Sequence, residues 1–108
     1  EGQFMELLES FCTDMAQANT RDEILLGKPY TEDGKTYFRI KDLKEDLVKH
    51  RFTDMETNRV ASKLRDLKAK HKFFNIKGRG TNVWYIDEFE YREDEDGLDA
   101  KDFEEKTL

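Results

Sequence analysis

Residues 54–70 carry polar and basic side chains at a spacing that gathers them on one side of a helix. Val60, Leu64 and Leu67 recur at helical steps and mark the side that faces a core. The other side and its flanks carry amide, hydroxyl and cationic groups, from Asn58, Arg59, Ser62, Lys63 and Arg65. Amide, hydroxyl and guanidinium groups can hydrogen-bond base edges in a DNA major groove, and cations pair with phosphates. An ordinary solvated helix face has a similar composition, so both interpretations stay open.

A second basic element follows along the chain. Residues 72–77 and 82–86 are rich in aromatic and β-branched side chains and predict two strands, and the glycine-rich segment 78–81 suits the end of a hairpin. Lys72, Lys77 and Arg79 bracket this end. A basic hairpin end with little side-chain bulk can follow phosphates or insert an arginine into a minor groove. The alternative is a solubilising loop without a ligand.

The strands also carry aromatic side chains that could stack on bases, as they do in single-strand binders: Tyr37, Phe38, Phe73, Phe74, Trp84 and Tyr85. We expect about half of them to pack against the helices, because a small sheet must bury one face.

The residues that usually perform catalysis are poorly placed for it. His50 and His71 fall at or near the ends of predicted helices, where the helix dipole alone favours a cationic imidazole. Cys12 lies on an apolar helix close to Glu9, which does not activate a thiol. The sequence shows neither a cysteine pair nor a phosphate-binding loop. We therefore expect no catalytic residue, no metal site and no cofactor, and a protein that binds rather than an enzyme.

Charge is segregated along the chain. The net charge of −6 argues against a nucleic-acid ligand when taken alone. However, residues 28–85 contain fifteen basic and eight acidic side chains, and residues 86–108 contain three and eleven. A nucleic-acid surface is therefore expected in the middle of the chain. The acidic end predicts a flexible tail, because it offers little apolar area to offset the entropy of ordering.

The length of 108 residues indicates one domain, for which we expect residues 1–86, with the tail at 87–108. Helices are expected at 4–19, 41–50 and 54–70, the last one opened by a capping box of Thr53 and Glu56. A strand is expected at 36–40, after a turn at Asp33 and Gly34. The order helix, strand, helix, helix, strand, strand predicts an α+β winged helix-turn-helix, with three helices and a small antiparallel sheet whose last hairpin is the wing.

The surroundings of the domain can also be anticipated. A single cysteine suggests a reducing compartment, and the chain shows neither a signal peptide nor a run of apolar residues long enough for a membrane span. We therefore expect a cytoplasmic protein with no membrane contact. The absence of an initial methionine suggests a piece of a longer protein.

Three stretches carry a resemblance: residues 35–43 (KTYFRIKDL), 64–67 (LRDL) and 73–85 (FFNIKGRGTNVWY). They resemble the winged-helix domains at the C-terminal ends of primase and helicase replication proteins from phages and mobile elements. The resemblance covers about residues 28–86. It implies a module that follows a motor or primase, holds duplex or forked DNA in a bacterial or phage-infected cell, and has DNA and its parent replication protein as partners. The acidic tail departs from this pattern.

Two other functions remain open, because winged helices also serve as protein-docking modules. The long apolar first helix and the acidic aromatic tail would suit a docking module of a replication complex. A sequence-specific transcriptional regulator is the other alternative, and it would need a dimer to read two half-sites.

Overall fold

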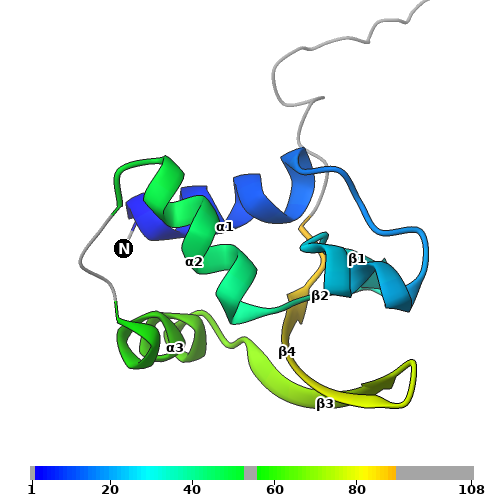
Figure 1. Cartoon of the computed structure of the whole chain (residues 1–108). Coiled ribbons are helices and arrows are strands. Elements are labelled where there is room, and N and C mark those ends of the chain that lie inside the picture. Colours follow the sequence, from blue (N-terminus) through cyan, green and yellow to red (C-terminus); the bar gives the residue numbers. More distant parts are fainter. Residues whose placement is uncertain (1, 53–55, 90–108) are drawn as a thin grey trace, which may run out of the picture.

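The computed structural model describes residues 2–52 and 56–89, and it shows an α+β arrangement of helices beside a small sheet (Figure 1). Its elements are, in chain order, α1 (Gly2–Asp14), the 3-10 helix η1 (Arg21–Leu26), β1 (Tyr30–Glu32), β2 (Lys35–Phe38), α2 (Ile40–Lys49), α3 (Thr57–Asp66), β3 (Lys70–Ile76) and β4 (Arg79–Asp87). The expected order of elements is present, with η1 and β1 in addition.

The sheet is antiparallel throughout, with the strand order β1-β2-β4-β3. Both hairpins close with two residues in the left-handed region, Asp33 and Gly34 (φ 54° and 77°) and Lys77 and Gly78 (φ 53° and 74°). This is the geometry of the type I′ turn, which matches the twist of antiparallel strands. The prediction at Asp33 and Gly34 is confirmed. The second turn is shorter than predicted, because Arg79, Gly80 and Thr81 already belong to β4.

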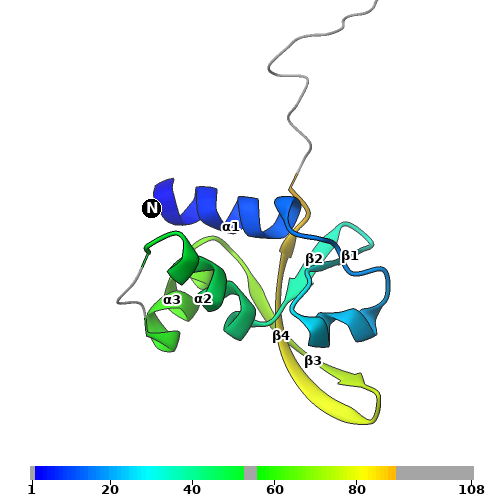
Figure 2. The same cartoon turned by 45° about the horizontal axis from the view of Figure 1, so that its top comes forward.

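One face of the sheet closes the main core against the helices. Phe38, Trp84 and Ile86 pack there with Phe4, Leu8 and Phe11 of α1, Leu43 and Leu47 of α2, and Val60 and Leu64 of α3. On the other face, Ile24 of η1 covers Phe74, Ile76 and Val83 in a smaller cluster. The two ends of the β3–β4 hairpin therefore have different surroundings, since its base packs on helices and its far end projects beyond them (Figure 2).

Two helices end sooner than the sequence predicts. The first stops at Asp14 rather than near Asn19. The third stops at Asp66 rather than at Lys70 or His71, because Lys68 takes a φ of 72° and the Ala69 amide donates to the Leu64 carbonyl. This is a Schellman end, for which glycine at the left-handed position is the usual sequence signal. Lysine occupies that position here, so no residue type signals the end of the helix.

The start of the third helix also differs from the prediction. It begins at Thr57, with the backbone of Glu56 extended as the N-cap and without a side-chain capping bond. Glu56 is therefore not the third helical residue that a capping box requires. The proposed partner, Thr53, and the predicted start at Asp54 lie outside the described residues.

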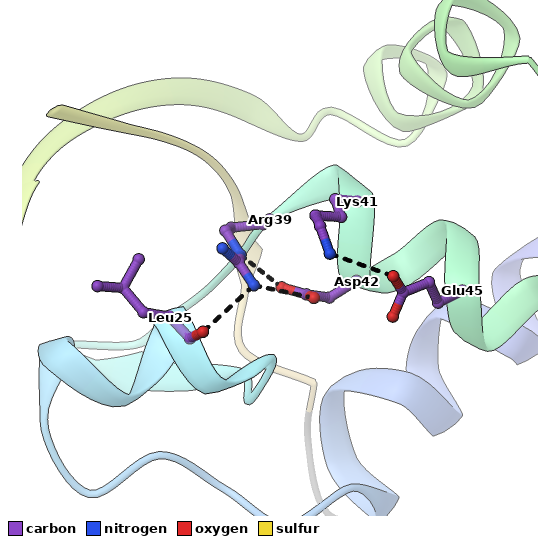
Figure 3. Close-up of polar contacts among 5 residues, drawn as sticks. All are labelled: Leu25, Arg39, Lys41, Asp42 and Glu45. Carbon is purple, nitrogen blue, oxygen red and sulfur yellow. Dashed lines mark hydrogen bonds and ion pairs between the residues drawn. The ribbon is translucent and has the colours of Figure 1, made fainter. Parts of the chain in front are cut away.

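An ion pair holds η1, β2 and α2 together (Figure 3). Arg39, which precedes α2, donates from Nε to Asp42 Oδ2 at 2.7 Å and from Nη2 to Oδ1 at 3.1 Å. The same Nη2 donates to the carbonyl of Leu25 in η1 at 3.4 Å. Gly27 lies close by with a φ of 90°, and a Cβ there would press on Asp42 Oδ1 at 3.3 Å.

The described residues 2–52 and 56–89 include no helix long and apolar enough to cross a membrane. The predicted tail from residue 87 is described only at its beginning. Asp87 still belongs to β4, the Glu88 amide donates to the Gly34 carbonyl at 2.8 Å, and Phe89 packs on the main core.

Candidate nucleic-acid interface

The outer side of α3 carries most of the predicted contact residues. Val60 and Leu64 are fully buried, and the opposite positions Asn58, Arg59, Ser62 and Arg65 are exposed. Helical periodicity causes this split, because residues three and four apart share a side of the helix. Arg59, Ser62, Lys63 and Asp66 line a shallow hollow on this surface.

Lys63 is turned partly inward. Its ammonium lies 5.8 Å from the centre of the Phe4 ring in α1, and the side chain is half-buried. A cation over an aromatic face gains from the ring quadrupole. Lys63 therefore helps to attach α3 to α1, and only part of it remains accessible to a ligand.

The end of α3 meets the base of the hairpin through a ring contact. The Arg65 guanidinium carbon lies 5.7 Å from the centre of the buried Trp84 ring, and the His71 ring lies 5.2 Å from it. Arg65 and His71 thus both contact the Trp84 ring, so the end of α3 and the base of the hairpin meet at this ring. His71 was expected near a helix end and not as a contact residue, but it lies in β3 beside Trp84.

The far end of the hairpin presents Lys77 and Arg79, both exposed. Phe73 is 66% exposed on the same hairpin, and its ring lies across Gly80 of the neighbouring strand, where a Cβ would collide with it. Gly80 thus has a packing reason to be glycine, apart from any close approach to a ligand.

Lys72 lies on the other face of the sheet. Successive side chains of a strand point to opposite faces, and His71 points to the helical side through Trp84. Lys72 instead has its ammonium 5.7 Å from the centre of the Phe74 ring, in the cluster under η1. Lys72 was predicted to contact DNA together with the α3 residues, but the structure places it on the opposite face of the sheet.

Acidic side chains also border α3, since Glu56 and Asp66 are exposed at its two ends. Phosphates approaching this surface would therefore meet both signs of charge. The basic residues of α3 and the hairpin outnumber these two acids: Arg59, Lys63, Arg65, Lys68, Lys77 and Arg79.

The single cysteine is set apart from these surfaces. Burial on α1, with a smaller effect from the Glu9 charge, raises the pKa of the Cys12 thiol to about 12. A thiol with this pKa stays protonated at neutral pH and is a poor nucleophile. In the described part of the chain, no group of three or more His, Cys, Asp or Glu side chains is placed to hold a metal ion.

Comparison of the chain with family models, with curated proteins and with solved structures finds no match.

Proposed function

We propose that this chain is a winged helix-turn-helix module that binds DNA without catalysis, with α3 in the major groove and the β3–β4 hairpin as a wing. The observation that supports this most directly is the exposed row of Asn58, Arg59, Ser62 and Arg65 on α3. The second helix of an adjacent pair is the one that enters the groove in this class of module.

The contacts divide by chemistry. Asn58, Arg59 and Ser62 lie toward the beginning of α3, where base edges are usually read, and they can donate or accept hydrogen bonds there. Lys63 and Arg65, together with Lys77 and Arg79 on the wing, suit phosphates. Arg65 supports this geometry, because its contact with Trp84 links the helix to the base of the hairpin.

The resemblance of residues 28–86 to primase and helicase C-terminal domains supports a role in DNA replication. The module would hold duplex or forked DNA for a parent replication protein. It would then act in the cytoplasm of a bacterial or phage-infected cell.

Fluorescence anisotropy with labelled duplex DNA, across a range of salt concentrations, tests the proposal. We expect salt-sensitive binding that Arg59→Gln and Arg79→Gln weaken and that Lys28→Gln, on the loop between η1 and β1, leaves unchanged. Lys28 pairs with Glu23 at 3.8 Å and belongs to neither α3 nor the β3–β4 hairpin. Failure to bind any duplex at low salt would refute the proposal.

A protein-docking module is the second candidate, supported by a groove along α2. Ile40, Val48 and Thr57 line it with Lys41, Lys44 and Glu45, and Val48 is 59% exposed. An exposed apolar side chain in a groove is a common feature of docking surfaces. If Val48→Ser weakens attachment to a parent protein and duplex DNA does not bind, this second function replaces the first.

A further inference from the structure

A row of aromatic side chains crosses the sheet on the face turned away from the main core. Tyr30 of β1 is paired with Tyr37 of β2, Tyr37 with Tyr85 of β4, and Tyr85 with Lys70 of β3. Directly paired residues point to the same face of a sheet. Since Trp84 points into the main core, its neighbour Tyr85 and the whole row point the other way. We call Tyr30, Tyr37 and Tyr85 the tyrosine row, and Lys70 lies next to it on β3.

The rings of the row contact one another and remain accessible. Tyr37 and Tyr85 have ring centres 5.2 Å apart, and Tyr30 and Tyr37 have theirs 6.4 Å apart. Each tyrosine is only half-buried. Phe74 lies beside Tyr37 on the same face, with its ring centre 5.0 Å away, and helps to fix the Tyr37 ring. The sheet thus holds a set of packed aromatic rings that is partly open to solvent, beside the cluster under η1.

Cations gather at one end of the tyrosine row. Lys35, Lys68 and Lys70 line a hollow of about 110 Å³ together with Tyr85, Ile86 and Asp87. Asp87 forms an ion pair with Lys35 at 2.8 Å, whereas neither Lys68 nor Lys70 forms an ion pair within residues 2–52 and 56–89. Three ammonium groups beside one carboxylate give the hollow a net positive charge. Lys72 extends the basic character along β3.

The other end of the tyrosine row has a different charge. Glu32 and Asp33 lie beside Tyr30 and Tyr37, and their charges raise the pKa values of both phenols, in addition to the larger effect of burial. Arg21 partly offsets them through its ion pair with Glu32 at 3.3 Å. A polyanion would therefore favour the Tyr85 end of the row over the Tyr30 end.

We propose that the tyrosine row and the lysine hollow form a second nucleic-acid site, specific for single strands. Two bases would stack on Tyr37 and Tyr85, and a backbone phosphate would lie in the hollow near Lys68 and Lys70. Stacking suits any base, because every base has a π-face, and it needs unpaired bases. The site lies on the opposite face from α3, so it goes beyond the proposed duplex binding and does not depend on it.

The test measures binding of the full chain to labelled single strands of about 12 nucleotides, DNA and RNA in separate arms, by anisotropy at low salt. A strand of equal length with abasic sugars is the first control. We expect it to bind at least about tenfold more weakly, because it keeps the phosphates and lacks the stacking. Equal binding of the two strands, or no binding of the base-containing strand, would overturn the proposal.

Variants then assign the site. Tyr37→Leu/Tyr85→Leu should weaken single-strand binding about tenfold or more, while the matched Tyr37→Phe/Tyr85→Phe keeps the rings and the affinity. Lys68→Gly/Lys70→Gln should reduce the salt slope by about 0.7, the effect of one lost phosphate contact. Circular dichroism checks that each variant is folded. If a variant does not fold, the comparison of abasic and base-containing strands on the unmutated chain still tests the site. Single-strand affinity that is the same in the leucine and phenylalanine variants would also refute the site.

The duplex measurements keep the two sites apart. Arg59→Gln on α3 should weaken duplex binding and leave single-strand binding unchanged, and the leucine variant should do the reverse. If the unmutated chain binds single strands but no duplex, the proposed function is wrong and this second site stands. If it binds duplex but shows no base-dependent binding of single strands, this second site is wrong and the proposed function stands.

Discussion

Arg39 donates two hydrogen bonds to the carboxylate of Asp42. Asp42 lies in the first turn of α2, and Arg39 directly precedes this helix. The side chains are 22% and 9% exposed, so water screens the pair only in part. A carboxylate in the first turn of a helix also interacts favourably with the helix dipole. Since Arg39 reaches the Leu25 carbonyl as well, the pair fixes the angle at which β2 leads into α2 beside η1.

Asp42→Asn should therefore lower the free energy of unfolding by about 1–3 kcal/mol, because the amide keeps the shape but leaves the guanidinium without its counter-charge. Urea unfolding measures the difference. Glu45→Gln is the matched control, since it removes the exposed ion pair with Lys41 on the same helix and should cost less than about 0.5 kcal/mol. Equal losses in the two variants would mean that the partial burial of the Arg39 pair has no energetic effect.

Two residues with left-handed backbone conformation follow helices, and replacing them with glycine is expected to raise the free energy of unfolding. Arg51 and Lys68 follow α2 and α3 with φ values of 64° and 72°. Glycine adopts this conformation without steric cost, so Arg51→Gly and Lys68→Gly should each raise the free energy of unfolding by about 0.5–1 kcal/mol. Lys49→Gly, inside the last turn of α2, should instead lower it by about 1 kcal/mol. Destabilisation by all three glycines would argue against the Schellman ends.

The buried thiol of Cys12 predicts how stability depends on alkaline pH. Its pKa is raised from 9.0 to about 12, chiefly by burial, so the unfolded chain loses this proton first as the pH rises. The unfolded state then binds fewer protons than the native state, and stability falls by about 1.4 kcal/mol per pH unit between these two values. Below about pH 9 the thiol makes no pH-dependent contribution.

Urea unfolding at about pH 8 and about pH 10 should show a loss roughly 1 kcal/mol larger in the natural chain than in Cys12→Ala. Titration of lysines and tyrosines affects both proteins and cancels in this comparison. Parallel losses would show that the thiol ionises as readily in the folded protein as in the unfolded one.

The sequence was sufficient for much of the fold, because its main signals are local. The residue types of Asp33 and Gly34 predict their turn, and the spacing of Val60 and Leu64 predicts the buried side of α3. The end of α3 was missed because Lys68 takes a position where glycine is the usual signal. The strand β1 was missed because its three residues are identified only by their pairing with β2.

The surfaces were harder to predict, since they depend on strand pairing across the sheet. Of the aromatic residues considered for stacking, Phe38, Phe74 and Trp84 are buried, and only pairing shows that Tyr37 and Tyr85 share an open face. Tyr30 completes their row from a strand that local patterns did not reveal. Strand alternation and the contact with Phe74 place Lys72 on the face away from α3. Arg79 is paired with Ile76 and shares that face, so Lys72 is separated from Lys77 and Arg79 along the hairpin and not across the sheet.

That separation gives a prediction about duplex DNA, which depends on the proposed function. Lys72 lies over Phe74 in the middle of β3, whereas Lys77 in the turn and Arg79 at the start of β4 are at the hairpin end. Lys77→Ala/Arg79→Ala should lower duplex affinity for all sequences about equally and reduce the salt slope by about 1.8, as two lost phosphate contacts do. Lys72→Ala should leave duplex affinity within about twofold, because its ammonium lies over Phe74 in the middle of β3 and not at the hairpin end. A salt slope that falls with Lys72→Ala but not with the double variant would place the duplex on the tyrosine face and remove the hairpin end from the interface.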